Sequence, residues 1–475
     1  MLAFHLSNPR GLGALRDWPH TGVAGGAACG DLVRIAVRVE GERVVEAGFD
    51  AEGCGAARAA GSAVVELVEG VPFLDAARVT IDDVDDALGG LVAPKRHAAQ
   101  LAADALHRAL GAAARAGAAR LEPRPRRTLV AMSGGVDSAA AAQLALDAGD
   151  EVVAVTLELW ADPATDGERS CCSPQAVTGA RDLAHGMGIP HVTLDLRDRF
   201  RAEVVEDFLD GYGSGRTPNP CVRCNGQVRF DAMLELADAL GAARLATGHY
   251  ARIERDRDGL LVRTAADGGK DQSYMLARLE PAVLERLSFP LGGLTKDTVR
   301  ALARDAGLPV ADKRESQDLC FVAGLGGRAF LQRHGGPRLR RAGEIVDRDG
   351  RVLGHHEGQH NFTVGQRRGL RLSSPEPMYV LEKDAETGRV TVGPREALLA
   401  TRVPLEDVRL HRGPEAVDSV KLRYRSAPIR CRVRENGGRL ELELERAATA
   451  VAPGQLACLM RGDCVVGEGT IGELT

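Results

Sequence analysis

The order of apolar and polar residues predicts regions of different character along the chain. Alternating stretches on either side of Gly41 indicate a β-hairpin, and Ala-rich helical sequence follows from about Ala56 and again over Gln100–Ala119. These elements predict a small α+β domain over residues 1–120. Two prolines among arginines then break the pattern, so we predict a linker at Leu121–Arg127.

Residues 128–325 alternate between strand-like and helix-like sequence. The short apolar run TLVAM is followed by the Gly-rich turn SGGVDS and by an Ala-rich helix that ends near Gly149. The segments VVAVTLELW, HVTLDL and RLATGHY continue the alternation. Strands that alternate with helices are typical of a doubly wound parallel sheet, so we expect an α/β domain here.

The sequence changes character again at about Gly326. Gly, Arg and His crowd the segment as far as Leu370, and short alternating strands follow in MYVLEKD, RVTVG, VKLRYR, IRCRVREN and RLELELE. This pattern predicts a small central domain over residues 326–390 and a C-terminal β-barrel over residues 391–475.

Charge adds an asymmetry to this picture. The net charge of the 475 residues is −5, but the segment from Gly326 to Thr475 holds 25 Lys and Arg against 20 Asp and Glu, a balance of +5. A basic C-terminal part suits a polyanionic partner. The alternative is a solvated surface with uneven charge.

Apolar runs are too short for a membrane span, which needs about 18 residues. The N-terminus has neither a long apolar core nor a small-residue cleavage site, so we expect a soluble, cytoplasmic protein without a membrane partner. In a reducing cytosol the ten cysteines are more often reactive, metal-binding or buried than paired in disulfides. The adjacent Cys171 and Cys172 are interpreted as loop residues without a chemical role.

The turn at Ser133–Ser138, SGGVDS, follows a strand and opens a helix. Glycines let backbone N–H groups approach an oxyanion, and the helix N-terminus adds partial positive charge, so the turn is suited to phosphate. The pattern GxxxxGK[ST] of kinases and GTPases is absent. SGGVDS resembles the signature of the PP-loop ATP pyrophosphatases, which transfer AMP to a carbonyl oxygen and which include tRNA thiolases, GMP synthetases and NAD synthetases.

Further motifs select among these families. From about Thr128 to the C-terminus, the chain resembles the tRNA-specific 2-thiouridylase (MnmA) family. The motifs, in family order, are GRTPNPCVRCN (Gly215–Asn225), ATGHYAR (Ala246–Arg252), GKDQSYML (Gly269–Leu276), ESQDLCF (Glu315–Phe321), FTVGQRRGL (Phe362–Leu370) and VKLRYR (Val420–Arg425).

The resemblance implies ATP-dependent 2-thiolation of the wobble uridine, position 34, of tRNA. ATP, with Mg²⁺, would adenylate the uridine O2, and sulfur from a cysteine persulfide or from a cluster would replace that oxygen. The alternative is another PP-loop ligase, which amidates a small molecule. The ATP contacts implied are Ala131, Met132, Ser133, Gly134, Gly135, Val136, Asp137, Ser138, Leu157 and Gly248. The tRNA contacts implied are Asn219, Pro220 and Cys221 against the target base, with His249, Lys270, Asp271, Gln272, Arg423, Tyr424 and Gln455.

Sulfur transfer needs a thiolate that carries a persulfide and often a second thiol that resolves it. By resemblance, Cys320 carries the persulfide and Cys224 is the nucleophile. Many family members have Asp where this chain has Cys221, which creates a CxxC pattern with Cys224. Together with Cys320, this pair is also suited to a three-thiolate iron–sulfur site, and zinc is a weaker option. Persulfide and cluster chemistry both remain open.

The first 115 residues resemble iron–sulfur scaffold proteins of the NifU/IscU type. The motifs are GAACGD, GCGAARAAGS and APKRHAAQLAADAL, in which Cys29, Asp31, Cys54 and His97 match cluster-binding positions. The family's third cysteine is replaced by Ala98, which cannot bind metal. Zinc held by the four matching residues fits their chemistry. The alternative is a degenerate scaffold domain that docks a sulfur donor, such as a cysteine desulfurase or a sulfur relay protein.

Overall fold

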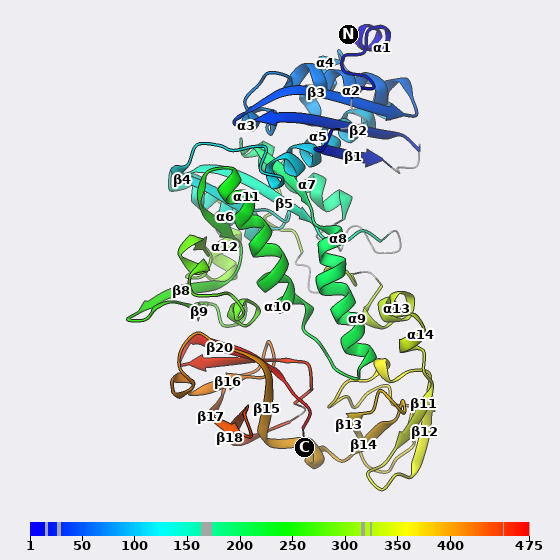
Figure 1. Ribbon diagram of the computed structural model, residues 1–475, viewed down its shortest axis with the longest axis vertical. Coiled ribbons are helices and arrows are strands. Elements are labelled where there is room, and N and C mark those ends of the chain that lie inside the picture. Colours follow the sequence, from blue (N-terminus) through cyan, green and yellow to red (C-terminus); the bar gives the residue numbers. More distant parts are fainter. Residues whose placement is uncertain are drawn as a thin grey trace.

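The computed structural model describes residues 1–14, 18–25, 30–162, 173–314, 319–323, 325–449 and 451–474. In Figure 1 the N-terminal domain lies above a central α/β domain, and two separate β domains lie below it. Cys29, Cys171 and Cys172 fall outside the described residues, as do Glu315–Asp318 of the ESQDLCF motif. No helix of the described ranges is long and apolar enough to cross a membrane.

The N-terminal domain is a three-stranded antiparallel sheet, in the order β1-β2-β3, covered by helices. The predicted hairpin is confirmed, with Gly41 in the left-handed region at φ 61° between the two long strands. The apolar faces of α2 and α5 pack on the sheet around Phe49. The elements are α1 (Leu2–Ser7), β1 (Thr21–Gly25), β2 (Leu32–Glu40), β3 (Arg43–Glu52), α2 (Gly55–Val68), α3 (Phe73–Ala76), α4 (Ile81–Ala87), η1 (Ala93–Lys95) and α5 (His97–Arg115).

The α/β domain contains the predicted parallel sheet, in the order β10-β7-β4-β5-β6. Neighbouring residues of β4 face opposite sides: Val130 packs with α6 and α7, whereas Leu129 packs with α11. The elements as far as α9 are β4 (Arg124–Ala131), α6 (Val136–Asp147), β5 (Glu151–Glu158), α7 (Pro174–Gly186), β6 (His191–Asp195), α8 (Arg197–Phe200), the π-helix η2 (Arg201–Val205) and α9 (Glu206–Gly213). The later elements are α10 (Pro220–Cys224), the π-helix η3 (Asn225–Arg229), α11 (Phe230–Ala239), β7 (Ala242–Thr247), β8 (Ala251–Asp256), β9 (Gly259–Thr264), η4 (Ser273–Leu276), η5 (Val283–Arg286), β10 (Leu287–Ser288) and α12 (Lys296–Asp305).

The predicted linker at Leu121–Arg127 is wrong from Arg124 onward, because β4 already begins there. Arg127 is 2% exposed, and its guanidinium donates to the carbonyl of Leu240 and to the carboxylate of Glu151. The arginines that suggested a solvated connection therefore fix the first strand of the sheet. The N-terminal domain is joined to the sheet without a free tether.

Helix α5 covers the edge strand β6 of the parallel sheet. A side chain at Gly111 would meet the carbonyl oxygen of Thr193 at 1.9 Å, so glycine permits this close approach. The ring nitrogens of His107 lie 2.9 Å from the carbonyl oxygens of Val79 and His191. The backbone N–H of His191 also donates to the carbonyl of Ala77, so the N-terminal domain contacts the edge strand through its backbone as well.

The downstream part forms two β units. Strands β13 and β14, from the segments MYVLEKD and RVTVG, join the central sheet, in the order β12-β11-β14-β13. The pairing of β15 with β20 closes the C-terminal strands β15-β18-β17-β16-β19-β20 into the predicted barrel, and the β8–β9 hairpin extends it. The central elements are α13 (Gly327–His334), α14 (Gly336–Leu339), β11 (Gly343–Val346), β12 (Val352–His356), η6 (Gln359–Asn361), β13 (Tyr379–Lys383) and β14 (Val390–Gly393). The C-terminal elements are η7 (Arg395–Leu398), β15 (Leu399–Leu410), η8 (Pro414–Ala416), β16 (Ser419–Lys421), β17 (Ile429–Asn436), β18 (Arg439–Thr449), β19 (Leu456–Arg461) and β20 (Cys464–Ile471).

Candidate functional site

The SGGVDS turn connects the end of β4 to the N-terminus of α6. Gly134 has φ 69°, a conformation that favours glycine, and Gly135 is the N-cap of the helix. The Ser138 hydroxyl accepts from the backbone N–H of Ser133 at 3.1 Å and donates to the carbonyl of Gly135 at 3.0 Å. The turn is therefore closed on itself at a helix N-terminus, an arrangement that binds anions.

A cavity of about 220 Å³ lies beside this turn. Its lining includes Ala131, Met132, Ser133, Asp137, Ser138, Leu157 and Gly248 from the sequence-predicted ATP contacts. It also includes Val155, Thr156, Asn225, Arg229, Phe230, Met233, Thr247, His249 and Gln272. Gly134, Gly135 and Val136 belong to the turn but not to this lining. The structure thus brings seven of the predicted residues to one cavity at the carboxyl ends of β4, β5 and β7.

Gly248 allows the chain after β7 to approach the phosphate turn. A Cβ atom at this position would lie 2.8 Å from the backbone N of Ser138. Such a contact is too short, so any side chain would push the two segments apart.

Two lysines that sequence reasoning missed reach the turn from downstream. Lys296 Nζ donates to both carboxylate oxygens of Asp137, at 2.7 and 2.8 Å, and the Tyr250 hydroxyl donates to one of them at 2.8 Å. Lys313 Nζ donates to the carbonyl of Gly134 at 2.9 Å. The proximity of Lys313 to the ESQDLCF motif was the available sequence signal. One carboxylate beside incoming phosphates suits Mg²⁺, which commonly binds through one or two carboxylates and substrate phosphates.

His249 and Gln272, predicted to contact tRNA, line the cavity beside the phosphate turn. The Oε1 atom of Gln272 accepts from the backbone N–H of Tyr250 at 2.9 Å. Burial, with a contribution from Arg229, lowers the pKa of His249 to about 3. Its imidazole is therefore neutral near pH 7 and does not supply a positive charge for phosphate.

The candidate thiols lie on two segments. Cys224 is buried at the end of α10, where the helix continues into the π-helix η3, and Cys221 is partly exposed one turn earlier. Cys320 is partly exposed and packs against the main core. These three thiols do not form a metal-binding group within 4.8 Å in the described part of the chain. A spacing of 4.8 Å describes the ligands of one metal ion and not those of a multi-iron cluster, so the iron–sulfur alternative for these cysteines stays a prediction.

Several predicted tRNA positions from distant motifs lie near one another. Cys221, Lys270 and Asp271 are close enough to Tyr424 to influence the pKa of its hydroxyl, which burial raises. Asn219 caps α10, where its side chain accepts from the N–H of Val222 at 3.4 Å, and Pro220 is the first residue of the helix. Arg423 is exposed beyond the end of β16.

Two other predicted tRNA positions make contacts that attach the barrel to the α/β domain. Asp271 is 8% exposed and accepts from Lys421 Nζ at 2.8 Å. Gln455 donates through Nε2 to the carbonyl of Thr217 at 2.6 Å. Both side chains thus have internal partners in this structure.

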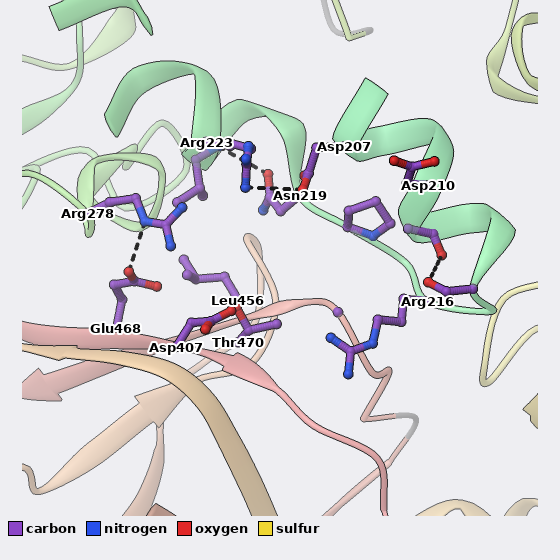
Figure 2. A pocket seen from close by; sticks show the side chains of 15 residues that line it. Asp207, Asp210, Arg216, Asn219, Arg223, Arg278, Asp407, Leu456, Glu468 and Thr470 are labelled. Atoms are coloured by element: carbon purple, nitrogen blue, oxygen red, sulfur yellow. Dashed lines mark hydrogen bonds and ion pairs between the residues drawn. The ribbon is translucent and has the colours of Figure 1, made fainter. Parts of the chain in front are cut away.

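Figure 2 shows a larger cavity, of about 520 Å³, between α9, α10 and the barrel. Asn219 lines it. Its arginines are held by carboxylates: Arg223 by Asp207 at 3.1 Å and Arg278 by Glu468 at 3.0 Å. These pairs connect the walls of the cavity but leave little unpaired positive charge on them.

The N-terminal domain contains a compact group of metal-ligating atoms. Asp31 Oδ2 lies 3.0 Å from His97 Nε2 and 3.1 Å from Cys54 Sγ. All three ligand atoms lie within 4.8 Å of one another. Nitrogen, oxygen and sulfur at this spacing fit zinc. Ala98, at the position of the family's third cysteine, is fully buried in the first turn of α5.

The fold and the phosphate turn define a PP-loop nucleotide-binding protein joined to a scaffold-type domain. Family models match the NifU-like N terminal domain at residues 2–116 and the tRNA methyl transferase HUP domain at 126–324. Models of the tRNA methyl transferase PRC-barrel domain and the aminomethyltransferase beta-barrel domain match 328–394 and 406–471. The chain belongs to the bifunctional NifU/MnmA family: it is 45% identical to the bifunctional protein NifU/MnmA of Rubrobacter xylanophilus over 98% of this chain and 97% of that protein.

Shorter relatives match the downstream part. The tRNA-specific 2-thiouridylase MnmA of Geobacter metallireducens is 45% identical over 74% of this chain and 98% of its own length. Among solved structures, a 4-thiouridine synthetase–RNA complex with bound ATP matches 42% of this chain and 46% of its own, at 20% identity and a TM-score of 0.29.

Proposed function

We propose that this protein is a tRNA-uridine 2-sulfurtransferase that thiolates the wobble uridine, position 34, at the expense of ATP. The observation that carries the proposal is the joint presence of the closed SGGVDS turn, the adjoining cavity and the thiols Cys224 and Cys320 on a chain of this family. A PP-loop ligase that amidates a small molecule has no evident use for two such thiols.

The first step is adenylation. The uridine O2 attacks the α-phosphorus of ATP, pyrophosphate leaves, and the N3 proton is lost to solvent. The residues that line the cavity bind ATP, while Lys296 and Lys313 bring positive charge to the turn that would hold the phosphates. Mg²⁺ that arrives with ATP would add further charge neutralisation near Asp137.

The second step replaces the oxygen. The outer sulfur of a Cys320 persulfide attacks C2, and AMP leaves with the former uridine oxygen. Cys224, as a thiolate, then attacks the Sγ atom of Cys320; the sulfur–sulfur bond breaks, its electron pair forms the thiocarbonyl as N3 takes a proton back from solvent, and a Cys224–Cys320 disulfide remains. A thiol reductant restores the enzyme, and the sulfur donor restores the persulfide.

The RNA surface is proposed to comprise Asn219, Pro220 and Cys221 around the base, with Lys270, Arg423 and Tyr424 beside them. Tyr424 offers an aromatic face of the kind on which unstacked bases rest. For Asp271 and Gln455 we propose an indirect role, because their side chains hold the barrel in place.

This function is tested by incubating the protein with ATP, Mg²⁺, unmodified tRNA and sulfide, which attacks C2 of the adenylated base directly and so bypasses the persulfide. We expect 2-thiouridine and AMP to form together, and both to depend on tRNA with U34. Cys224→Ser should abolish turnover with a persulfide donor, whereas Cys464→Ser, a partly exposed thiol of the barrel, should not. AMP release that is indifferent to tRNA would contradict the proposal.

For the N-terminal domain we propose docking of a sulfur donor, such as a cysteine desulfurase, next to the Asp31–Cys54–His97 group. Exposed apolar side chains are concentrated in this domain and include Phe4, Leu6 and Val92. Leu6 lies beside Gly55, directly after Cys54, because a Cβ at Gly55 would meet it at 3.2 Å. Exposed apolar surface of this kind marks protein interaction sites.

A further inference from the structure

The cavity beside the phosphate turn contains a buried hydrogen-bond acceptor that the reaction steps above do not use. Asn225 is 5% exposed and lines this cavity. Its Oδ1 atom has no hydrogen-bond partner within the described residues. A buried amide oxygen without a partner is costly, so such an atom points to a ligand that donates to it.

The orientation of the amide is determined by its other end. Asn225 Nδ2 donates to the carbonyl oxygen of Met275 at 3.3 Å. Because a carbonyl can only accept, the nitrogen must face Met275, and the amide cannot flip without placing two oxygens against each other. The group that Asn225 offers to the cavity is therefore an acceptor.

The position of Asn225 indicates which part of the substrate lies near it. It directly follows Cys224 and opens the π-helix η3, and π-helical turns are frequent at functional sites. Together with Arg229, Phe230 and Met233, Asn225 lines the cavity from the helical segment. The phosphate turn supplies other lining residues. In the proposed function, Cys320 delivers sulfur to C2 of the uridine, and Cys224 then attacks the Cys320 sulfur. C2 must therefore come close to Cys224. N3 is bonded to C2.

We propose that Asn225 is a specificity-determining residue whose Oδ1 accepts a hydrogen bond from N3–H of the target uridine. Cytidine also has an O2 carbonyl that could be adenylated, so the chemistry alone does not exclude it. Before adenylation removes the N3 proton, the bases differ at N3, which is a donor in uridine and an acceptor in cytidine, so the contact selects the base as it binds. Two opposed acceptors repel, and a buried polar group left unpaired discriminates strongly between substrates. This inference rests on the proposed function.

The test compares thiolation of one tRNA with U34 and of the same tRNA with C34, by the wild type, by Asn225→Ala and by Asn436→Ala, an exposed asparagine of the barrel. ATP affinity is measured in parallel, and it also reports folding of the cavity. The wild type and Asn436→Ala should thiolate U34 and discriminate against C34. Asn225→Ala should lower kcat/KM for U34 by about 10- to 100-fold and narrow the U34/C34 ratio, with ATP affinity within twofold of wild type.

A loss of ATP affinity with an unchanged U34/C34 ratio would overturn the inference, because Asn225 would then contact the nucleotide. Unchanged kinetics in Asn225→Ala would also overturn it, since the acceptor would meet only water. A wild type that forms no 2-thiouridine on U34 would contradict the proposed function itself, a result that differs from both.

Discussion

At the residue scale, positive charge at the phosphate turn comes from outside the motif. SGGVDS has no lysine, and Lys313 reaches the Gly134 carbonyl from a segment 179 positions later in the sequence. We predict that Lys313→Met raises KM for ATP by about tenfold, because a charge-assisted contact to phosphate is lost. Steady-state AMP formation with saturating tRNA checks this. Arg257→Met, at an exposed turn, is the control; equal KM values in the two variants would argue against a phosphate role.

At the scale of elements, the contact between α5, α7 and β6 holds three histidines. Burial lowers the pKa of His107 and His191 well below the ordinary value and that of His185 to about 4, with Arg181 adding to the effect in each case. Separated or unfolded elements would bind protons at higher pH, near 6.5. The contact is therefore fully stable above pH 6.5 and loses stability as pH falls toward 4.

The expected result is a drop in thermal stability between pH 7 and pH 5, accompanied by easier proteolysis near α5. A loss on the order of 1 to 3 kcal/mol corresponds to one or two such histidines. His185→Gln should flatten part of this dependence, while His355→Gln, at an exposed position of β12, should leave it unchanged. Identical pH profiles for the two variants would show that the interface histidines are not responsible.

The elements also show how far sequence reasoning reaches. Periodicity predicted the β2–β3 hairpin, because one buried face imposes a regular alternation, and the succession of apolar runs and helical sequence predicted the parallel sheet. It failed at Arg124–Arg127, where Arg124 and Arg127 pair with Glu151, a partner that lies elsewhere in the chain. Motif resemblance predicted a common role for Ser133 and Gly248, and both line one cavity. It could not show that the side chain of Asp271 has an internal partner, because Lys421 is 150 residues away in the sequence.

At the scale of the whole molecule, the N-terminal domain is a fixed part of the body, because α5 covers β6. Docking of a desulfurase is therefore best tested without deleting the domain. Phe4→Ser with Leu6→Ser should slow thiolation severalfold when the desulfurase supplies sulfur, and free sulfide should restore the rate. Val352→Ser, an exposed apolar residue of the central domain, is the control. A defect that sulfide does not rescue would count against docking.

Docking does not require the ligand atoms of the Asp31–Cys54–His97 group. Cys29→Ala with Cys54→Ala should leave thiolation largely intact, because docking needs surface and not sulfur or metal chemistry at these residues. If this double variant is as defective as Phe4→Ser with Leu6→Ser, the domain carries sulfur or metal itself.

The proposed thiolation requires transfer of the uridine oxygen to AMP. The most direct measurement is thiolation in water enriched in ¹⁸O, followed by mass spectrometry of the AMP and of the nucleosides. We expect one AMP for each 2-thiouridine and no solvent ¹⁸O in the AMP, because its new oxygen comes from the uridine O2. AMP that contains solvent ¹⁸O would mean that water, not the uridine, attacks ATP, and would contradict the mechanism.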